Sequence, residues 1–449
     1  MTSFRILALG ALAAASTGAA YSQTTIRIVA SNGDRPGTQT AISHLLASGW
    51  TFQGINGNTS STGDLTIATN ANFGAWSGTY QGSPVVIKVS YAGALAGIAA
   101  VSGNTDQRFV VSNGTGTGAV PSPLTGTTLG TDYEIGKADF GFSTNFQSTS
   151  PFNGVFQGVT YSPLVEEVVG VSPLGFYASP GFPATGANIT TQLAQLLYTS
   201  GSVRLSQFTG DYTNDINKTV WAIGRNTDAG QRFGAYTEVG LGTSTSVRVW
   251  QPSFATADGG TAQTTTSGIT YGGVVGSQAL WPAETVSNVF SPLGSGGYSS
   301  GALVSSALTV KLGVNAYKGR FFNDDTGAYE FLYPNATDGF YIGYATPSDA
   351  NNRVLGLSGV VPVANRGVAL SYNGVALTDD NVRNGKYTAW LYNRIIKPQS
   401  GLTGLKLTFA NALRDQIKNV DAPSGGSLFD DANFKVRRFT DGGLVTPKN

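Results

Sequence analysis

The sequence predicts an α/β protein built on an open sheet, with enough chain for two or three lobes. Its most informative segments each begin as a buried strand and then run into a polar loop, in most cases followed by a helical pattern. Strands that alternate with helices favour a largely parallel sheet, in which ligands lie beyond the carboxyl ends of the strands. The chain has 449 residues, whereas a domain typically holds about 100–200 residues. We therefore expect more than one hydrophobic core.

The first strand, loop and helix unit lies near the start of the sequence. Ile26–Ala30 alternates as a strand does, and the polar loop Ser31–Gly37 follows it. Ala41, Ile42 and Leu45 then recur at helical spacing. This order predicts a strand that delivers a polar loop to the start of a helix.

Two further segments repeat the pattern. Pro84–Ser90 is rich in β-branched residues and breaks at Tyr91–Gly93, after which Ala94–Val101 can form a helix. Ala138–Asn145 is a third strand that ends in hydroxyl and amide side chains. We expect these polar strand ends to lie at one edge of the sheet.

A fourth segment, Val220–Gly234, contains two arginines in the turn between a buried strand and a helix start. Free backbone N–H groups at a helix N-terminus, together with a guanidinium group, can bind phosphate or carboxylate. Arg225 and Arg232 in this turn therefore indicate an anion site. The alternative interpretation is an ordinary solvated turn with surface arginines.

Other parts of the chain are predicted to be structural. Thr190–Tyr198 has an N-capping residue and an apolar face, and Phe409, Leu413 and Ile417 indicate a helix near the C-terminus. Three stretches rich in Gly, Ser and Thr are expected to be long loops: Gly114–Gly130, Thr256–Gly268 and Ser291–Gly301. The 60 glycines alone would favour a rival class, a glycine-rich all-β surface protein.

The N-terminus resembles a secretory signal. Arg5 precedes the apolar run Ile6–Ala15, and Ala20–Ser22 supplies a small-x-small cleavage site, so residues 1–22 are expected to be removed. The sequence has no other apolar run of about 18 residues, the length that a membrane helix needs. It therefore predicts a periplasmic or secreted protein with no stable membrane anchor. The absence of cysteine excludes disulfides.

Charge and residue types exclude several functions. Arg5 is the only charged residue before Gln23, so the remaining chain has 26 basic and 26 acidic residues and no electrostatic footprint for nucleic acid. With one histidine, His44, and no cysteine, the chain offers no zinc site. Asp324 and Asp325 are consistent with a calcium loop or with an ordinary polar turn, and their composition favours the turn. We expect no cofactor, no metal and no enzymatic activity.

The order of these segments resembles the substrate-binding proteins of the phosphate importer and their relatives, in the type II periplasmic-binding-protein superfamily. Each motif is short, and the set runs from about Thr25 to about Asn419. The motifs that carry the resemblance are Ile28–Gly33, Gly93–Ile98, Ala138–Ser143, Asn188–Leu193 with Phe208–Gly210, Gly224–Arg232, Tyr341–Ala345, Tyr372–Val375 and Asn384–Tyr387.

The resemblance implies two α/β lobes, joined by two crossover strands, that close on a ligand in the cleft between them. It places the first part of lobe 1 at residues 23–172, lobe 2 at 173–345, the return to lobe 1 at 346–420 and a C-terminal tail at 421–449. It also implies an exported solute-binding protein for a phosphate-like oxyanion, used for import with an ABC permease or for scavenging. Carried over by position, the binding residues would be Ser31, Asn32, Gly33, Ser143, Thr144, Arg225, Gly230, Gln231 and Arg232.

Departures from the family pattern affect the ligand more than the fold. Ala94 stands where the family commonly has a hydroxyl group, and Ala229–Gln231 replaces a Ser-Gly-Thr run. A hydrogen bond to a charged ligand contributes about 1.5–3 kcal/mol, so several losses weaken binding by orders of magnitude. Asp34 is either a local turn residue, which we favour, or an acceptor for a protonated phosphate. Weak phosphate binding, a larger anion and a secreted structural or adhesive protein with a degenerate site all stay open.

Overall fold

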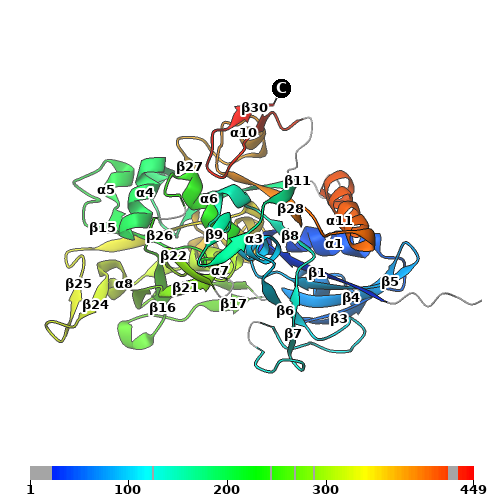
Figure 1. Ribbon diagram of the computed structural model, residues 1–449. Helices are drawn as coiled ribbons and strands as arrows, with labels where there is room; N and C mark the ends of the chain where they lie inside the picture. The colour runs from blue at the N-terminus through cyan, green and yellow to red at the C-terminus, as the bar shows by residue number, and fades with distance from the viewer. Residues whose placement is uncertain are drawn as a thin grey trace, which may run out of the picture.

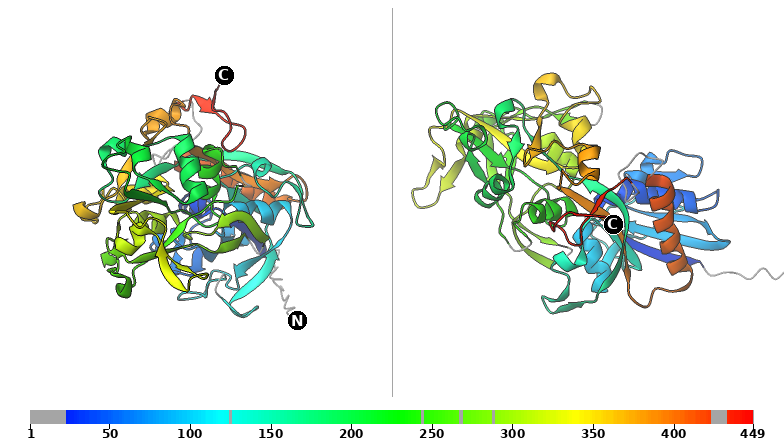
Figure 2. Two further views of the ribbon diagram at one scale, coloured as in Figure 1. Left: turned by 90° about the vertical axis from the view of Figure 1, so that its left-hand side faces the viewer. Right: turned by 90° about the horizontal axis from the view of Figure 1, so that it is seen from above.

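The computed structural model describes residues 23–123, 126–242, 245–266, 269–286, 289–422 and 433–448. An eight-stranded sheet and a six-stranded sheet, each flanked by helices, form two lobes that lie side by side (Figure 1; Figure 2). The predicted two-lobed α/β fold is thus confirmed, and the rival all-β class is wrong. The expected signal segment at residues 1–22 lies outside the described residues. In the described part of the chain, no helix is both long and apolar enough to cross a membrane.

The first lobe is organised around β1 (Thr24–Ala30). This strand pairs in parallel with β5 (Ser83–Ser90) on one side and with β8 (Phe140–Ser143) on the other. All three strands were predicted from the sequence. Because they run in the same direction, the loops that follow them leave from one edge of the sheet. The sheet has the order β11-β28-β8-β1-β5-β4-β2-β3.

Helices cover this sheet, and smaller hairpins extend it. The predicted helices are present as α1, α3 and α11. The remaining bounds in this lobe are α1 (Arg35–Leu45), β2 (Thr51–Gly54), β3 (Gly57–Ser60), α2 (Thr66–Thr69), β4 (Phe73–Tyr80), α3 (Ala94–Ser102), β6 (Asp106–Val110), β7 (Tyr133–Lys137), β9 (Gly154–Phe156), β10 (Val159–Tyr161), β11 (Leu164–Pro173), β28 (Trp390–Pro398) and α11 (Gly404–Gln416).

The second lobe has the sheet order β13-β27-β12-β26-β15-β14. Its helix α4 begins as predicted, because the Thr190 hydroxyl accepts a hydrogen bond from the Leu193 amide at 3.2 Å. The bounds are β12 (Gly175–Ala178), β13 (Asn188–Ile189), α4 (Thr191–Ser200), β14 (Ser202–Arg204), α5 (Ser206–Thr209), β15 (Lys218–Ala222), α6 (Gly230–Glu238), α7 (Gly301–Ala307), α8 (Val314–Lys318), β26 (Asp338–Ala345), α9 (Pro347–Arg353), β27 (Val368–Tyr372) and α10 (Asp379–Arg383).

Short paired strands decorate the second lobe. Two of the three predicted Gly/Ser/Thr-rich loops contain them, so those two segments are not irregular throughout. They are β16 (Trp250–Ser253) with β20 (Ser277–Leu280), β17 (Thr264–Thr266) with β18 (Ile269–Tyr271), β19 (Val274–Val275) with β23 (Lys311–Leu312), β21 (Ala283–Val286) with β22 (Val289–Ser295), and β24 (Arg320–Asn323) with β25 (Ala328–Phe331). Asp324 and Asp325 lie in the turn between β24 and β25.

Two crossing segments join the lobes and pair with each other. β11 leaves the first sheet and passes through Leu174 directly into β12 of the second. β28 returns, and it is antiparallel to β11 from Leu164 opposite Pro398 to Pro173 opposite Trp390. We call β11 and β28 the hinge ribbon. The chain therefore returns to the first sheet at Trp390, later than the expected boundary at residue 346, because β27 still pairs with β12 in the second lobe.

The C-terminal segment Asn433–Lys448, which we call the strap, touches both lobes. Phe434 and Val436 join the hydrophobic core of the second lobe. Asp441 lies against the first lobe, where it accepts hydrogen bonds from the Phe146 amide at 2.7 Å and the Thr149 hydroxyl at 2.5 Å. Seen from above, the strap crosses the junction between the lobes (Figure 2).

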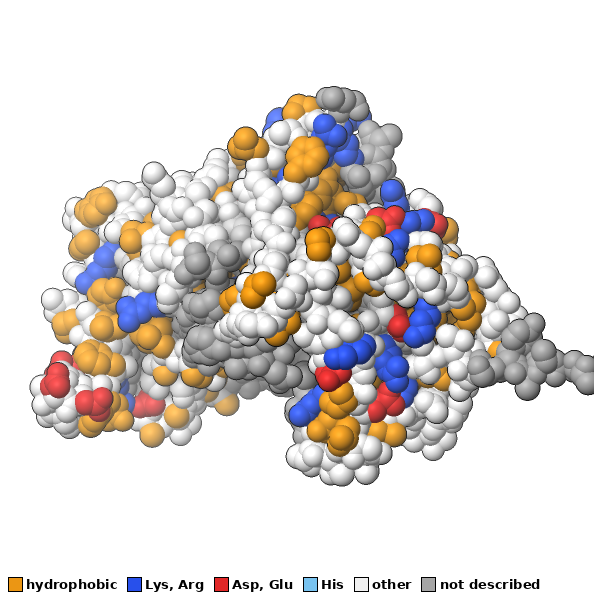
Figure 3. Space-filling model, in the orientation of Figure 1, with side chains coloured by type: hydrophobic (Ala, Val, Ile, Leu, Met, Phe, Trp, Pro, Cys, Tyr) orange, Lys and Arg blue, Asp and Glu red, His pale blue; other side chains and the backbone are white. Residues whose placement is uncertain are grey.

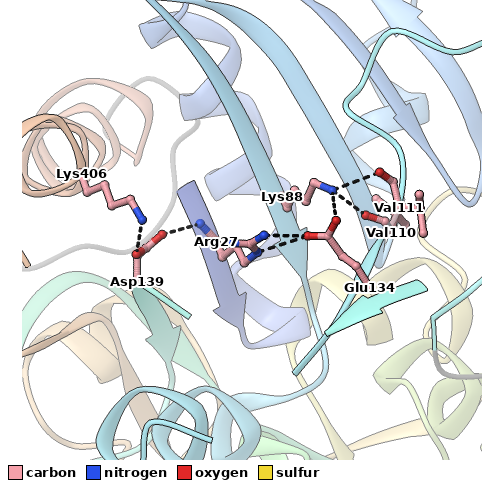
Figure 4. A network of polar contacts seen from close by, with 7 residues as sticks. All are labelled: Arg27, Lys88, Val110, Val111, Glu134, Asp139 and Lys406. Carbon is pink, nitrogen blue, oxygen red and sulfur yellow. Dashed lines mark hydrogen bonds and ion pairs between the residues drawn. The ribbon is translucent and has the colours of Figure 1, made fainter. Parts of the chain in front are cut away.

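A charge network around the buried Lys88 ties two central strands of the first sheet to a neighbouring hairpin (Figure 4). The Lys88 ammonium donates to the carbonyls of Val110 and Val111 at 3.0 and 3.1 Å and pairs with Glu134 at 2.6 Å. Glu134 also pairs with Arg27 at 2.8 Å. Burial lowers the pKa of Lys88, and Glu134 opposes that change. The network ties β1 and β5 to the hairpin β6–β7.

We expect Glu134→Gln to destabilise the fold by about 2 kcal/mol, because it leaves the Lys88 ammonium buried without its counter-ion. Denaturant unfolding would measure this change. Asp106→Asn is the matched control, because it breaks the Asp106–Lys137 pair on the same hairpin, where the two side chains are 60% and 48% exposed. That variant should cost no more than about 1 kcal/mol. Equal effects of the two variants would contradict the role of the buried network.

Candidate functional site

The candidate site lies between the lobes, where the loops after β1, β5 and β8 meet the loop after β15. One pocket brings these four loops together. Seven of the nine residues predicted for binding line it: Ser31, Asn32, Gly33, Thr144, Arg225, Gly230 and Gln231. Its other lining residues are Gly93, Ala94, Ser172, Ala229, Thr346 and Leu391.

Two helix N-termini face this pocket without side-chain caps. α3 follows Gly93, which has a φ of 136° that favours glycine, and α6 follows Ala229. Neither Gly93 nor Ala229 can offer a side-chain oxygen to the first turn of its helix. The first backbone N–H groups of a helix have no intrahelical acceptor, and the helix dipole makes this end positive. Both helices can therefore donate to an oxyanion.

The first loop adds further polar groups to the pocket. Asn32–Asp34 form the short 3₁₀ helix η1, and the Ser31 hydroxyl accepts a hydrogen bond from the Gly33 amide at 3.1 Å. The Asn32 side-chain oxygen is buried without a hydrogen-bond partner among the described residues. A polar atom buried in this way is costly unless a ligand or water pairs with it. The loop is thus polar and faces the pocket.

Arg225 supplies the positive charge of the site. Its Nε and Nη2 atoms donate to the carbonyls of Tyr298 and Ser299, each at 3.1 Å, and its Nη1 atom donates to the Gln231 side chain at 2.7 Å. Burial lowers the pKa of Arg225 to about 10, so the guanidinium stays charged at neutral pH. The Gln231 oxygen occupies the Arg225 donor that is nearest to the helix start.

Two predicted ligands, Arg232 and Ser143, lie beside the pocket and do not line it. Arg232 is fully buried, and its Nη1 atom donates to the carbonyls of Arg225 and Gly296 at 2.9 and 3.0 Å. Ser143 accepts a hydrogen bond from the Asn145 amide at 3.1 Å. Both side chains support the loops that form the pocket. The reason is the direction in which side chains point: a shift of one residue along a helix start or a strand end turns the side chain away from the cleft.

The two lobes are closed on each other at this point. The Asn145 side-chain amide of the first lobe donates to the Gly230 carbonyl of the second at 3.4 Å. A Cβ atom on Gly230 would lie 2.8 Å from the Ala94 Cβ and closer still to Thr144. The pocket holds about 20 Å³, which is roughly the space of one water molecule. An anion would therefore require the loops to separate.

The sequence interpretation did not include three residues that the structure places at the site. Asn145 makes the contact between lobes, and Ser172 and Thr346 line the pocket. Thr346 precedes the proline that starts α9, an N-terminal signature that was readable from the sequence. Ser172 lies in the hinge ribbon, and no local motif marks it. Ala94 lines the pocket without a hydroxyl group, as the sequence indicated.

Asp34 lies next to the site and is more than a turn residue. Its backbone carbonyl accepts a hydrogen bond from the Thr38 hydroxyl at 2.7 Å, but its carboxyl Oδ2 atom has no partner among the described residues. Burial raises the pKa of Asp34 to about 8, although the Arg394 charge opposes this shift. The carboxyl is therefore largely protonated at neutral pH and can donate a hydrogen bond.

We expect Asp34→Asn to stabilise the protein increasingly as the pH rises. The carboxyl has an ordinary pKa of 3.8 and a folded value of about 8, so between these values the folded state binds more protons than the unfolded state. Stability is then lost as the pH rises from about 4 to about 8. The two pKa values differ by about four units, so the variant should gain roughly 5–6 kcal/mol over the wild type at pH 8.5 and little at pH 4. Urea unfolding at several pH values measures this, and a gain independent of pH would contradict it.

The described residues contain no group of three or more His, Cys, Asp and Glu side chains that could bind a metal ion. His44 is half-exposed, and its Nδ1 atom lies 2.8 Å from the Asp421 carboxylate. This pair connects α1 to the end of the C-terminal helix. It lies outside the pocket that the loops form.

No family model matches the chain, and no curated protein matches its sequence. Among solved structures, the chain is similar to a candidate phosphate ABC transporter substrate-binding protein with bound phosphate from Clostridium perfringens (11% identity, TM-score 0.43, covering 91% of this chain and 100% of the other). It is also similar to an ABC-type phosphate transport receptor from Vibrio cholerae (10% identity, TM-score 0.43, covering 90% and 100%). The strand order described above, rather than these similarities, establishes the two-lobed fold.

Proposed function

We propose that the protein is an exported solute-binding protein that binds a small oxyanion, most simply phosphate, in the cleft between its lobes. The observation that carries this proposal is the convergence of two uncapped helix N-termini, those of α3 and α6, with the buried Arg225 on one pocket. Backbone amides and one fixed cation are sufficient to bind a tetrahedral anion. Import with an ABC permease, or scavenging, is the role that such binding would serve.

Anion binding in the cleft would require a local rearrangement around Gln231. Gln231 accepts a hydrogen bond from Arg225, so its oxygen occupies a donor that an oxyanion would need. An entering oxyanion would displace the Gln231 side chain, take over the Arg225 Nη1 donor and accept the first amides of α6. The Asn145 contact to Gly230 would lengthen in the same step.

Isothermal titration of the chain from Gln23 onward with phosphate, sulfate and small carboxylates tests this proposal. We expect one of these anions to bind, and Arg225→Lys to weaken that binding tenfold or more because the fork of donors is lost. Arg320→Lys is the matched control, since Arg320 is also a paired, partly buried arginine but lies on the outlying β24–β25 hairpin. No binding of any of these anions at millimolar concentration would overturn the proposal.

One observation favours a second candidate, a secreted structural or adhesive protein on the same scaffold. The cleft is closed and holds only about 20 Å³, and Ala94 and Ala229 replace hydroxyl donors. In that case Gln231→Ala, which empties the space beside Arg225, would create no anion affinity. If the cleft is a working site, the same variant should retain or increase binding.

A further inference from the structure

A second and larger hollow lies under the strap, away from the cleft. It has a volume of about 440 Å³, within the range of about 300–1,000 Å³ typical of small-molecule sites. We call it the strap groove. It is lined by the loop after β8, both strands of the hinge ribbon and the strap itself, through Phe146, Glu166, Val168, Tyr392, Arg394, Arg437, Arg438, Phe439 and Lys448.

The strap groove and the cleft lie on opposite faces of the hinge ribbon. Leu391 of β28 lines the cleft pocket, whereas Tyr392 and Arg394 line the strap groove. Successive side chains of a strand point to opposite faces, so this separation follows from the strand itself. The two hollows are therefore distinct and share the hinge ribbon.

The groove carries an excess of positive charge. Four basic side chains line it and only one acidic side chain, that of Glu166. Arg438 forms an ion pair with Glu238 at 2.9 Å. The Arg437 guanidinium lies 5.0 Å from the Phe439 ring centre, and its buried Nε atom has no hydrogen-bond partner among the described residues. Figure 3 shows basic and hydrophobic side chains side by side at the top of the molecule, over the strap.

Arg394 is the strongest indication of a ligand. Its side chain is 1% exposed, yet none of its three guanidinium nitrogens has a hydrogen-bond partner in the described part of the chain. Its Nε atom lies 4.0 Å from Glu166, and its Cζ atom lies 3.5 Å from the Phe146 ring centre. A buried guanidinium normally donates hydrogen bonds to protein acceptors, because burying unpaired N–H groups is costly.

The nearby acids do not satisfy Arg394. Burial raises the pKa values of Glu166 and Asp441, and Arg394 only partly opposes that rise. Both carboxyls direct oxygens elsewhere: Glu166 accepts from the Gln147 amide, and Asp441 accepts from the Phe146 amide and the Thr149 hydroxyl. The unused donors of Arg394 remain at the wall of the groove.

Aromatic side chains also line the strap groove. Tyr392 and Phe146 form its floor beside Arg394, and Phe439 of the strap is 66% exposed at its rim. An exposed phenylalanine beside arginine N–H groups that lack hydrogen-bond partners among the described residues suits a ligand that has both an anionic and an apolar part. Inorganic anions would leave this apolar surface unused.

We propose that the strap groove is a second binding site, for an organic anion with a carboxylate or phosphate head and an apolar or aromatic body. The head pairs with Arg394 and Arg437, and the body lies against Phe439 and Tyr392. Such a ligand would contact the strap, the hinge ribbon and the first lobe together, and so it would favour the closed arrangement. This site does not depend on whether the cleft binds an oxyanion.

Titration of the chain from Gln23 onward with phenyl phosphate, benzoate and inorganic phosphate tests this inference by calorimetry and ligand-observed NMR. We expect phenyl phosphate or benzoate to bind in the millimolar range or tighter. Arg437→Gln should weaken this binding tenfold or more, and Phe439→Ala several-fold. Both residues are partly or largely exposed, so these variants should fold. Arg108→Gln is the matched control, because Arg108 also lies over an aromatic ring, that of Tyr133 at 4.2 Å, but on the β6–β7 hairpin.

Four results would overturn the inference. One is that neither phenyl phosphate nor benzoate binds at 10 mM (roughly the limit of specific small-ligand binding). The second is binding that Arg437→Gln and Phe439→Ala leave unchanged. The third is inorganic phosphate binding as tightly as phenyl phosphate with the same dependence on Arg437, which would remove the need for an apolar body. Loss of binding in the Arg225→Lys variant alone would place the ligand in the cleft and would count against the groove.

Discussion

Gly230→Ala is expected to prevent closure of the lobes. A Cβ atom at this position would meet the Thr144 hydroxyl, the Asn145 side-chain oxygen at 2.7 Å and the Ala94 Cβ at 2.8 Å. All three belong to the first lobe, so the clash lies across the cleft. Small-angle scattering should show a larger radius of gyration than in the wild type. If the cleft binds an oxyanion, calorimetry should show a loss of affinity of about 100-fold or more, equal to about 2.7 kcal/mol.

The matched control for this experiment is Gly37→Ala. Gly37 lies in α1, and a Cβ atom there would meet nothing within 4 Å. Alanine in a helix is more stable than glycine by about 0.5–1 kcal/mol, so this variant should be slightly stabilised and should scatter like the wild type. A Gly230→Ala variant with the wild-type scattering profile would show that the contact between lobes is not closed in solution.

Arg438→Met is expected to give the largest loss of stability in the strap. The Arg438 side chain is 1% exposed and the Glu238 side chain 7% exposed, and Arg438 also donates to the Thr388 carbonyl at 2.6 Å. Removal of one partner of such a pair leaves a buried carboxylate without a counter-ion and costs about 3–5 kcal/mol. Burial raises the pKa of Glu238, and the Arg438 charge opposes that rise. The Arg438→Met variant should therefore be less stable at high pH than at low pH.

Chemical unfolding of three variants would test this second expectation. Lys386→Met changes an exposed lysine on the loop beside the strap and should alter stability by less than about 0.5 kcal/mol. The double variant Arg438→Met with Glu238→Gln removes both charges and should recover part of the loss. A single Arg438→Met variant as stable as the Lys386→Met control would show that the pair contributes nothing.

The sequence predicted the core of each lobe well because local patterns determine it. β1, β5 and β8 are buried strands with strong β propensity, and the helix that follows β1 has clear periodicity. The decorations were harder to predict. β22 falls in a glycine-rich stretch that was expected to be a loop, and it is a strand because β21 supplies its hydrogen bonds. Composition does not show such pairing.

The sequence predicted the candidate site about as well as it predicted the core of each lobe. Most of its residues belong to short local motifs at strand ends, and these motifs fall together once the fold forms. Arg232 and Ser143 share those motifs, but their side chains turn into the loops they support. No local sequence motif predicts the strap groove, because the groove combines Arg394 of β28 with a C-terminal tail that lacks apolar periodicity. Only the three-dimensional arrangement reveals it.

The strap gives the chain a third passage between the lobes, after β11 and β28. Two paired strands can flex as a simple hinge, whereas a third segment with Asp441 on one lobe and Arg438 on the other acts as a tether. Opening then requires the strap to detach from one lobe before the ribbon can bend. If the cleft binds an anion, the rate of its exchange would follow the lifetime of the strap contacts, and the C-terminal tail would set the timing of its release.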